Sequence, residues 1–406
     1  MFSLMEYRYR LNETKKRMMD EGIDVLLVSN PSNMYYLSGY SAWSFYVHQL
    51  LVVTLDDPQP LWIGREMDAS SVVKTTWLDE PQVIPYPDHY VQSETRHPMD
   101  FVTNILKEIG QGNRTIGVEM DAHYFTGLCY QRLQQGLTNG TFKNATTLIN
   151  WVRLIKSDQE IQVMRKAAKI AENAMKAAYD TVNVGVRECD VAAAISHAQI
   201  KGTAEFGGDY PSIVPMLPTG ENTSCPHLTW TDRTYQEGDY LTVEIAGCYK
   251  RYHVPIARTV SLGVAPEHVK ELAKVVIEGI HETLQMIRPG VAAEEVAATW
   301  SQFISKHGFE KNSRLGYSIG LSFPPDWGEH TVSLRQGDRT LLKPNMTFHL
   351  MPGIWYEDYG VEITESIRIT DDGVELLTNV SREIFEKPPS PPLWVDGNCA
   401  IKRDVD

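Results

Sequence analysis

The 406-residue chain contains few cysteines, and they form no recognisable pattern. The five cysteines lie far apart, and none belongs to a C-x-x-C pair. An odd number of isolated cysteines argues against a disulfide framework, and the missing pair spacing argues against a zinc knuckle. We therefore expect reduced thiols, as in a cytoplasmic protein.

The sequence also lacks long apolar runs and an excess of basic residues. It has no stretch of 18 apolar residues that would span a bilayer. The opening segment, MFSLMEYRYRLNETKKRMM, lacks the apolar core of a signal peptide. The formal net charge is −14, whereas nucleic-acid binding calls for a basic face. We expect a cytoplasmic protein with no membrane or nucleic-acid partner.

The composition that remains is typical of a globular protein with two domains. Apolar residues make up 42% and charged residues 22% of the chain. Apolar runs at 23–28, 50–55 and 115–120 predict buried strands that alternate with helices. We predict a mixed fold of the α/β (α+β) class. Its expected parts are an N-terminal α/β domain over 1–150, a catalytic domain over 151–388 and an extended, proline-rich tail over 389–406.

The second domain is predicted to open with a long amphipathic helix. Ser157 and Glu160 match the S-x-x-E capping box, in which each side chain accepts a hydrogen bond from a backbone N–H of the first turn. Apolar residues then recur on one helical face, starting at Ile161 and Met164. Further helices are predicted over 265–287 and 293–307, and strands over 240–246, 257–262, 345–351 and 361–369.

Two glutamates lie within predicted strands. Strand alternation places Glu365 on the same face as Ile363 and Ile367, where a carboxylate is costly unless it is paired, hydrogen-bonded or protonated. A functional site, a structural ion pair or a local irregularity of the strand would each explain it. Glu244 shares its face with Thr242, so a structural role there is nearly as well supported as a functional one.

Two loops carry further titratable side chains. In GENTSCPHLTW, His227 is a candidate general base, although most loop histidines are simply exposed. The segment YSIGLSFPPDWGEH brings Tyr317, Asp326, Glu329 and His330 into a loop rich in glycine and proline. Neither loop contains H-E-x-x-H, and the chain has no G-x-S-x-G elbow, P-loop or Rossmann fingerprint.

Three segments together resemble the creatinase/prolidase/aminopeptidase P family. LIKSDQEIQVMRKAAKIAENAM (154–175) is similar to the opening helix of that family's catalytic domain. YYLSGY (35–40) resembles its N-terminal Y-L-T/S-G turn, and LLKPNMTFHLMPGIW (341–355) resembles the strand entering its E-P-G turn. The resemblance implies a "pita-bread" catalytic domain, a smaller α/β N-terminal domain and a homodimer.

The metallopeptidases of this family hold two metal ions through Asp, Asp, His, Glu and Glu. By resemblance, these positions fall on Glu244, Pro255, Tyr317, Met351 and a residue at or next to Glu365. Proline has no side-chain donor atom, and methionine offers only a soft sulfur to a hard cation. The departure argues against a metal-dependent dipeptidase, and we expect neither a metal nor a cofactor.

Creatinase, a member without metals, relies on a histidine in the loop before the first ligand strand, and His227 matches it. The string PSIVPMLPTGENTSCPHLTW, with YSIGLSFPPDWGEH, is more similar to a cyclic-amidine hydrolase of the family. Such substrates carry a planar N–C–N cation, which carboxylates pair with well. The resemblance implies that Glu365, helped by Glu362 or Glu244, binds this cation. His227 would activate water, and Tyr317 would donate a hydrogen bond to the tetrahedral intermediate.

Other candidate substrate-binding residues come from loops and from the N-terminal domain. In creatinase-like dimers the partner's N-terminal domain closes the site, and YSAWSFYVHQ is the corresponding stretch. Its aromatic rings suit a flat cation, although ordinary packing explains them equally well. Besides Glu244, the candidates are Tyr252, Trp230, Asp326, His330, Trp43, Phe45, Tyr46 and His48.

Three alternatives remain open. A creatinase-like amidinohydrolase would differ only in its substrate. A metal-dependent Xaa-Pro dipeptidase would bind manganese, cobalt or zinc and lose activity with a chelator. A binding protein that kept the fold would show affinity without turnover.

Overall fold

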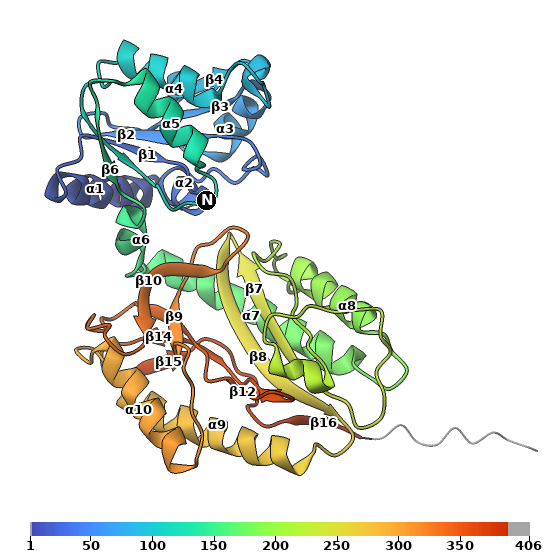
Figure 1. Ribbon diagram of the computed structural model, residues 1–406. Helices are drawn as coiled ribbons and strands as arrows, with labels where there is room; N and C mark the ends of the chain where they lie inside the picture. The colour runs from blue at the N-terminus through green and yellow to red at the C-terminus, as the bar shows by residue number, and fades with distance from the viewer. Residues whose placement is uncertain (1, 389–406) are drawn as a thin grey trace, which may run out of the picture.

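The computed structural model describes residues 2–388 (Figure 1). It contains helices and strands in both halves of the chain, as the predicted fold class requires. Within residues 2–388, no helix is both long and apolar enough to cross a bilayer. The tail predicted over 389–406 lies outside the described residues.

A six-stranded mixed sheet organises the N-terminal part of the chain. Its order is β4 (Val83–Tyr86), β3 (Leu61–Arg65), β2 (Leu50–Thr54), β1 (Val25–Val28), β5 (Thr115–Val118) and β6 (Thr141–Asn144). β1 runs antiparallel to β2 and parallel to β5. All four residues of β1 are buried, because successive side chains enter hydrophobic cores on opposite faces of the sheet.

Helices cover both faces of this sheet. The core on one face includes side chains of α1 (Leu4–Asp20), α2 (Pro31–Ser38) and α3 (Ala69–Thr75). The core on the other face includes side chains of α4 (Pro98–Glu108) and α5 (Gly127–Gly136). Short 3-10 helices occupy Glu66–Asp68, Glu80–Gln82 and Asp88–Tyr90.

A short helix, α6 (Leu148–Arg153), joins this part to the larger C-terminal part (Figure 1). The boundary expected near residue 150 therefore falls inside a helix. Buried polar contacts cross this junction: the Nδ2 of Asn33 donates to Asn150 over 2.9 Å, and Arg153 donates to Asn33 over 2.7 Å. Arg153 also pairs with Glu329 at 3.5 Å, so Glu329 belongs to the connection between the two parts.

The predicted capping box starts the first long helix of the C-terminal part, α7 (Asp158–Thr181). Glu160 N–H donates to Ser157 Oγ over 3.3 Å, and Ser157 N–H donates to Glu160 over 2.9 Å. α7 and α8 (Glu188–Lys201) pack on the antiparallel pair β7 (Tyr240–Tyr249) and β8 (Tyr252–Leu262). Gly247 permits this close packing, because a Cβ there would lie 1.9 Å from the Ala167 carbonyl. β16 (Phe385–Lys387) extends this sheet beside β8.

A five-stranded antiparallel sheet forms the other half of the C-terminal part. Its order is β10 (Gly328–Leu334), β9 (Gly316–Ile319), β11 (Thr347–Leu350), β14 (Glu365–Ile369) and β15 (Val374–Leu376). Its core includes side chains of α9 (Glu267–Met286) and α10 (Ala293–Lys306). The two predicted helices here are confirmed to within two residues at each end.

The strand predicted over 361–369 is interrupted. β13 (Gly360–Val361) pairs with β12 (Ile354–Trp355), and β14 begins only at Glu365. Between them, Thr364 turns to β8: its N–H donates to the Ala257 carbonyl over 3.1 Å, and its Oγ1 accepts from Ala257 N–H over 2.7 Å. The hydrogen bonds of Thr364 join the two sheets at this break. Because the strand is not continuous, the faces of Glu362 and Glu365 do not follow from simple strand alternation.

Candidate active site

Two buried glutamates face the seam between the two sheets. Glu244 comes from β7 and Glu362 from the break before β14; they are 4% and 1% exposed. Neither carboxylate oxygen of Glu362 has a hydrogen-bond partner among the described residues. A buried carboxylate without a partner is unusual and indicates a group that meets a ligand.

The protonation of this pair follows from burial and mutual repulsion. Burial raises the pKa of Glu362 to about 7, although the charge of Lys311 opposes the shift. Burial raises the pKa of Glu244 well above its ordinary value, and the nearby Glu362 charge raises it further. The pair therefore favours a bound proton in the free protein and would favour a bound cation.

Tyr317 lies beside the pair in a chain of hydrogen bonds. Its hydroxyl accepts from Trp327 Nε1 over 2.7 Å and lies 3.0 Å from His349 Nδ1. His349 Nε2 lies 2.8 Å from Thr364 Oγ1. Burial lowers the pKa of His349 to about 3, so its ring is neutral. Burial, followed by the Glu244 charge, raises the pKa of Tyr317 well above its ordinary value, which keeps it a neutral donor.

Glu365 faces other partners. Arg258 Nη2 donates to its Oε1 over 2.9 Å, and Arg382 Nε donates to the same oxygen over 2.8 Å. This is the structural ion pair that the sequence left open as an explanation. Both guanidinium groups contact Oε1, and Oε2 has no hydrogen-bond partner among residues 2–388. A carboxylate already paired with two guanidinium groups is less suited to hold a substrate cation than Glu362 or Glu244.

His227 is exposed on the loop that leads from α8 to β7. Met216 exchanges two backbone hydrogen bonds of 3.0 Å with Glu244, and Leu217 N–H donates to the Leu228 carbonyl over 3.2 Å. His227 comes directly before Leu228, whose backbone therefore lies two strand spacings, on the order of 10 Å, from the backbone of Glu244. Its ring forms no hydrogen bond or ion pair with any of residues 2–388. Trp230, on the same loop, is partly buried against the α7–α8 core.

Tyr252 is committed to the connection between the two parts of the chain. Its hydroxyl donates to Glu160 Oε1 over 2.6 Å and accepts from Arg10 Nη2 over 3.4 Å. Arg10 also lies 3.6 Å from Glu160. These contacts give Tyr252 a structural role and occupy the hydroxyl that substrate binding would need.

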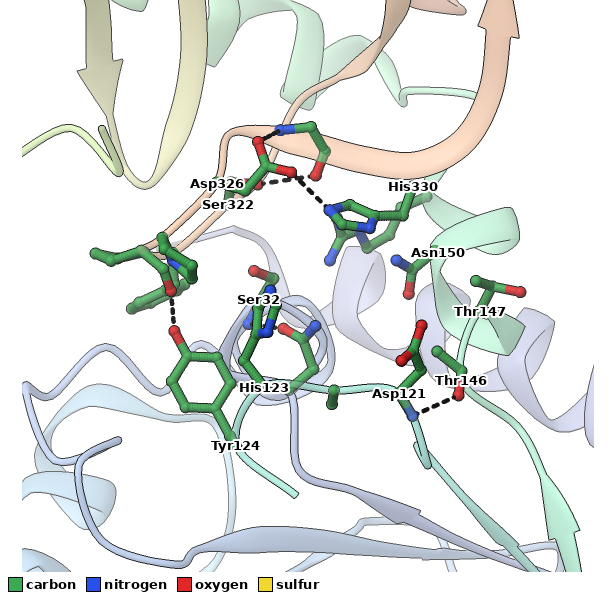
Figure 2. A pocket seen from close by; sticks show the side chains of 17 residues that line it. Ser32, Asp121, His123, Tyr124, Thr146, Thr147, Asn150, Ser322, Asp326 and His330 are labelled. Carbon is green, nitrogen blue, oxygen red and sulfur yellow. Dashed lines mark hydrogen bonds and ion pairs between the residues drawn. The ribbon is translucent and has the colours of Figure 1, made fainter. Parts of the chain in front are cut away.

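Asp326 and His330 line a separate cavity of about 300 Å³ between the two parts (Figure 2). His330 Nε2 lies 2.7 Å from Asp326 Oδ2. Asp121 and His123 contribute from the N-terminal side, and Figure 2 shows them facing the Asp326–His330 pair across the cavity. Asp326 also stands close enough to Tyr317 to raise its pKa, so this cavity adjoins the side of the site that Tyr317 forms.

The aromatic candidates of the N-terminal part divide into two groups. Trp43 packs edge-on against Tyr210 with ring centroids 4.7 Å apart, and Phe45 packs against Phe323 at 5.8 Å. Tyr46 remains 64% exposed. The two packed rings therefore contact the C-terminal part of their own chain.

His48 belongs to a small cluster inside the N-terminal part. Its Nδ1 lies 3.5 Å from Cys129 Sγ, and its ring centroid lies 4.8 Å from that of His97. Within the described part of the chain, these are the only three His, Cys, Asp or Glu residues grouped closely enough to suggest a metal site. The Nδ1 lone pair of His97 already accepts from Met99 N–H over 3.1 Å, which leaves its other nitrogen protonated and unable to ligate.

The residues around Glu244 do not fit the two-metal centre of the family. Pro255 lies opposite Ala246 on β8 and offers no donor atom. The Tyr317 hydroxyl is engaged by Trp327 and His349. No third His, Cys, Asp or Glu joins Glu244 and Glu362 in a metal-like group among residues 2–388. Two carboxylates are too few for such a centre.

The sequence did not predict some residues of the site. Lys311 comes from a polar loop with nothing to distinguish it from a surface lysine. Trp327 and Thr364 are ordinary residues whose contacts depend on the tertiary fold. His349, inside the apolar strand segment TFHL, did carry a signal, because a buried histidine needs partners.

Comparisons with known proteins place the chain among hydrolases. Residues 162–371 match metallopeptidase family M24, and residues 10–155 match the creatinase/prolidase N-terminal domain. The chain is 44% identical to ectoine hydrolase of Halomonas elongata over 95% of its own length and 98% of that protein. It is 45% identical to the uncharacterized hydrolase/peptidase y4tM of Sinorhizobium fredii, over 95% and 98%. The crystal structure of a Thermococcus sibiricus prolidase matches with a TM-score of 0.82 at 23% identity, over 95% and 100% of the two chains, which supports the fold.

Proposed function

This chain belongs to metallopeptidase family M24 and carries a creatinase/prolidase N-terminal domain, and on that basis we propose that it opens the ring of ectoine. It is a hydrolase acting on C–N bonds. Ectoine is a cyclic amidine with a carboxylate, and hydrolysis of its ring gives an N-acetyl-diaminobutyrate. The small-molecule substrate is then ectoine, or a related amidine or guanidine carboxylate.

The buried, unpartnered carboxylate of Glu362 carries this proposal. Both of its oxygens lack hydrogen-bond partners among the residues that the structure describes, and Glu244 lies close enough to repel it. A planar amidinium carries a positive charge, which offsets the repulsion between the two glutamates. It also carries parallel N–H donors, which can bond to the two oxygens of Glu362. Because the substrate supplies its own positive charge, the chemistry does not require a metal ion, and we propose a metal-independent enzyme without a cofactor.

The remaining groups divide the proton transfers. His227 takes a proton from water as the water attacks the amidine carbon, and it returns that proton to the departing ring nitrogen. Tyr317 is neutral and close enough to Glu244 to feel its charge. With its oxygen accepting from Trp327 and from His349 Nδ1–H, its own proton is free to donate a hydrogen bond to the tetrahedral intermediate. The exposed position of His227 requires its loop to move towards Glu244 when substrate binds.

The same pair also suits a guanidinium, so a creatinase-like amidinohydrolase is the second candidate.

Beyond the reaction, we propose that the protein is cytoplasmic and forms a homodimer. In such a dimer, the exposed Tyr46 and Trp43, which is 59% exposed, are available to the partner subunit's site. A metal-dependent Xaa-Pro dipeptidase is disfavoured by the donor set around Glu244.

The deciding experiment is NMR of chelator-treated protein incubated with ectoine, with the Glu362→Gln variant as the control. Ring opening by the wild-type protein and none by the variant is the expected result. If the ectoine spectrum stays unchanged and the protein with added manganese cleaves an Xaa-Pro dipeptide, the peptidase replaces the proposal. Turnover of creatine alone would replace it with the amidinohydrolase.

A further inference from the structure

Another cavity, of about 530 Å³, lies between α10, the loop before β9 and the end of β10. Among the described residues that line this basic cavity, the charged ones are all basic: Lys311, Arg314 and Arg335. Asp338 does not line it, and its carboxylate accepts from the N–H groups of Ser333 and Thr340, over 2.9 and 3.0 Å. Three cations with no acidic side chain among the lining residues favour the binding of an anion.

Lys311 is fixed in the wall of the basic cavity and keeps donors for a ligand. Its Nζ donates to the Gly353 carbonyl over 2.8 Å, and the ammonium stands over the Trp355 ring, 4.2 Å from the centroid. Burial lowers the pKa of Lys311 to about 8, so the side chain still carries a charge at neutral pH. An ammonium has three N–H donors, and residues 2–388 engage only one of them in a hydrogen bond.

The two arginines of the basic cavity are also largely uncommitted. Arg314 lies over the Tyr317 ring, 4.3 Å from the centroid, and its Nη1 donates to Ser333 Oγ over 3.3 Å. A guanidinium has five N–H donors, so most of those of Arg314 remain for a ligand. The Arg335 side chain forms no hydrogen bond or ion pair with any of residues 2–388. A guanidinium suits a carboxylate in particular, because it can bind both oxygens through parallel N–H donors.

Trp300 of α10 lines the same cavity and carries a donor without a partner. The indole is 1% exposed, and its Nε1 has no hydrogen-bond partner among residues 2–388. Its benzene edge faces α9, where a Cβ at Gly279 would lie 2.6 Å from Cζ3. The Nε1 edge is on the other side of the ring and faces away from that glycine. A buried N–H without an acceptor is unusual, and an anion in the basic cavity, or water bound with it, would supply the acceptor.

The basic cavity borders the carboxylate pair at two points. Arg314 covers the ring of Tyr317, which is close enough to Glu244 to feel its charge. The lysine of the cavity binds the Gly353 carbonyl, and a Cβ on the same glycine would lie 3.2 Å from Glu362 Cγ. An acidic side and a basic side therefore adjoin each other. A ligand that contacts both must be a short zwitterion.

We propose that the basic cavity binds the carboxylate of a zwitterionic substrate, while Glu362 and Glu244 bind its cation. The two glutamates alone would repel a carboxylate, and the cations of the cavity offset that repulsion. The cavity therefore selects amidines that carry a carboxylate over those without one. The choice of an amidine rests on the proposed function, whereas the binding of a carboxylate does not.

The first test is fluorine NMR with trifluoroacetate, a carboxylate probe that needs no assumption about the substrate. Wild-type protein should broaden the probe signal. Arg314→Met should weaken the binding on the order of 10- to 100-fold, the effect of losing a hydrogen bond from a charged donor. Arg339→Met is the matched control, because that side chain is 87% exposed and does not line the cavity. Equal broadening by the wild type and Arg314→Met would overturn the proposal.

Arg335→Met repeats the test at a second residue of the basic cavity. The side chain is exposed and has no hydrogen bond or ion pair within the described chain, so its loss does not threaten the fold. This variant should also bind the probe more weakly than the wild type. Should Arg314→Met fail to fold, unchanged binding by Arg335→Met would overturn the proposal.

Calorimetry then compares ectoine with the same cyclic amidine lacking the carboxylate. Wild-type protein should bind ectoine more tightly. Arg314→Met should remove most of that preference and leave the affinity for the analogue unchanged, whereas Glu362→Gln should weaken the binding of both. Equal losses for both ligands in Arg314→Met would overturn the proposal, because the arginine would then only support Tyr317. If neither ligand binds while the trifluoroacetate signal still depends on Arg314, the proposed substrate is wrong and the carboxylate site stands.

Discussion

Arg258 and Glu365 form a buried ion pair, with Nη2 of the arginine 2.9 Å from Oε1 of the glutamate. The guanidinium also donates to the carbonyls of Thr364 and Val380, over 2.6 and 2.8 Å. Arg382 adds a second cation to the same carboxylate oxygen. Glu365 thus neutralises an arginine that ties β8 to β14 through its Oε1, whereas its Oε2 has no hydrogen-bond partner among residues 2–388.

Glu365→Gln should destabilise the fold, because Arg258 would be left buried without its counter-ion. We expect a loss of roughly 3 kcal/mol in the free energy of unfolding, measured by urea denaturation. Asp180→Asn is the matched control: it breaks the exposed Lys176–Asp180 pair and should change stability by less than about 1 kcal/mol. Lost turnover with unchanged stability would return Glu365 to the active site.

The pH dependence of stability should report on Glu362. Its pKa in the folded protein is about 7, against an ordinary value of 4.5, so folding favours its protonated form. This contribution is present below about pH 4.5 and is lost as the pH rises through about 7. Above about pH 7 the stability lost relative to low pH amounts to roughly 3 kcal/mol.

Glu362→Gln should therefore gain stability over the wild type as the pH rises through this window, and the difference should level off above it. Urea denaturation at a series of pH values measures the effect. Glu357→Gln, at an exposed position, should follow the wild-type curve. A stability difference that stays constant with pH would mean that Glu362 is ionised throughout the range.

Local signals predicted the helices well, because each signal acts within a few residues. Ser157 and Glu160 define the start of α7 whatever the chain does elsewhere. The alternating pattern of residues 361–369 predicted one continuous strand. The structure instead interrupts it, because Thr364 forms hydrogen bonds with Ala257. Those bonds come from a residue more than a hundred positions away, so no local pattern announces them.

Contacts between residues far apart in the sequence also explain why the candidate site was predicted only in part. A buried carboxylate in this segment was anticipated, but its partner was not, since Arg258 lies on another sheet. Glu362 and Glu244 were anticipated only as helpers. Their importance depends on the packed structure, in which both are buried and neither oxygen of Glu362 has a hydrogen-bond partner among residues 2–388. Lys311 gave no signal, because its contact with Gly353 depends on the tertiary fold.

His227→Ala should abolish ectoine turnover and leave the fold intact. The side chain is exposed and forms no hydrogen bond or ion pair within the described chain, so its removal leaves no cavity and no unpaired partner. Loss of a general base lowers kcat by about 10²- to 10⁴-fold. Product NMR measures the rate, and urea denaturation checks the fold. His307→Ala, at an exposed histidine after α10, should keep full activity. Retained activity in His227→Ala would assign the base to another group.

Gly353→Ala should weaken ectoine binding through steric displacement. The added methyl would lie 2.4 Å from the Trp355 ring and 3.2 Å from Glu362 Cγ, so the indole must move. That movement removes the aromatic face under Lys311 and shifts the Glu362 carboxylate. We expect KM for ectoine to rise roughly tenfold or more, with about 1–3 kcal/mol lost from stability by overpacking.

Gly373→Ala is the matched control for that change, because a Cβ there meets no atom within 4 Å. It should leave both KM and stability close to the wild-type values. Steady-state kinetics followed by product NMR gives KM for both variants, and urea denaturation gives their stability. If Gly353→Ala lost stability and kept its KM, the Trp355–Lys311 contact would support only the fold. A rise in KM beyond the loss of folded protein would instead tie this glycine to the position of the Glu362 carboxylate.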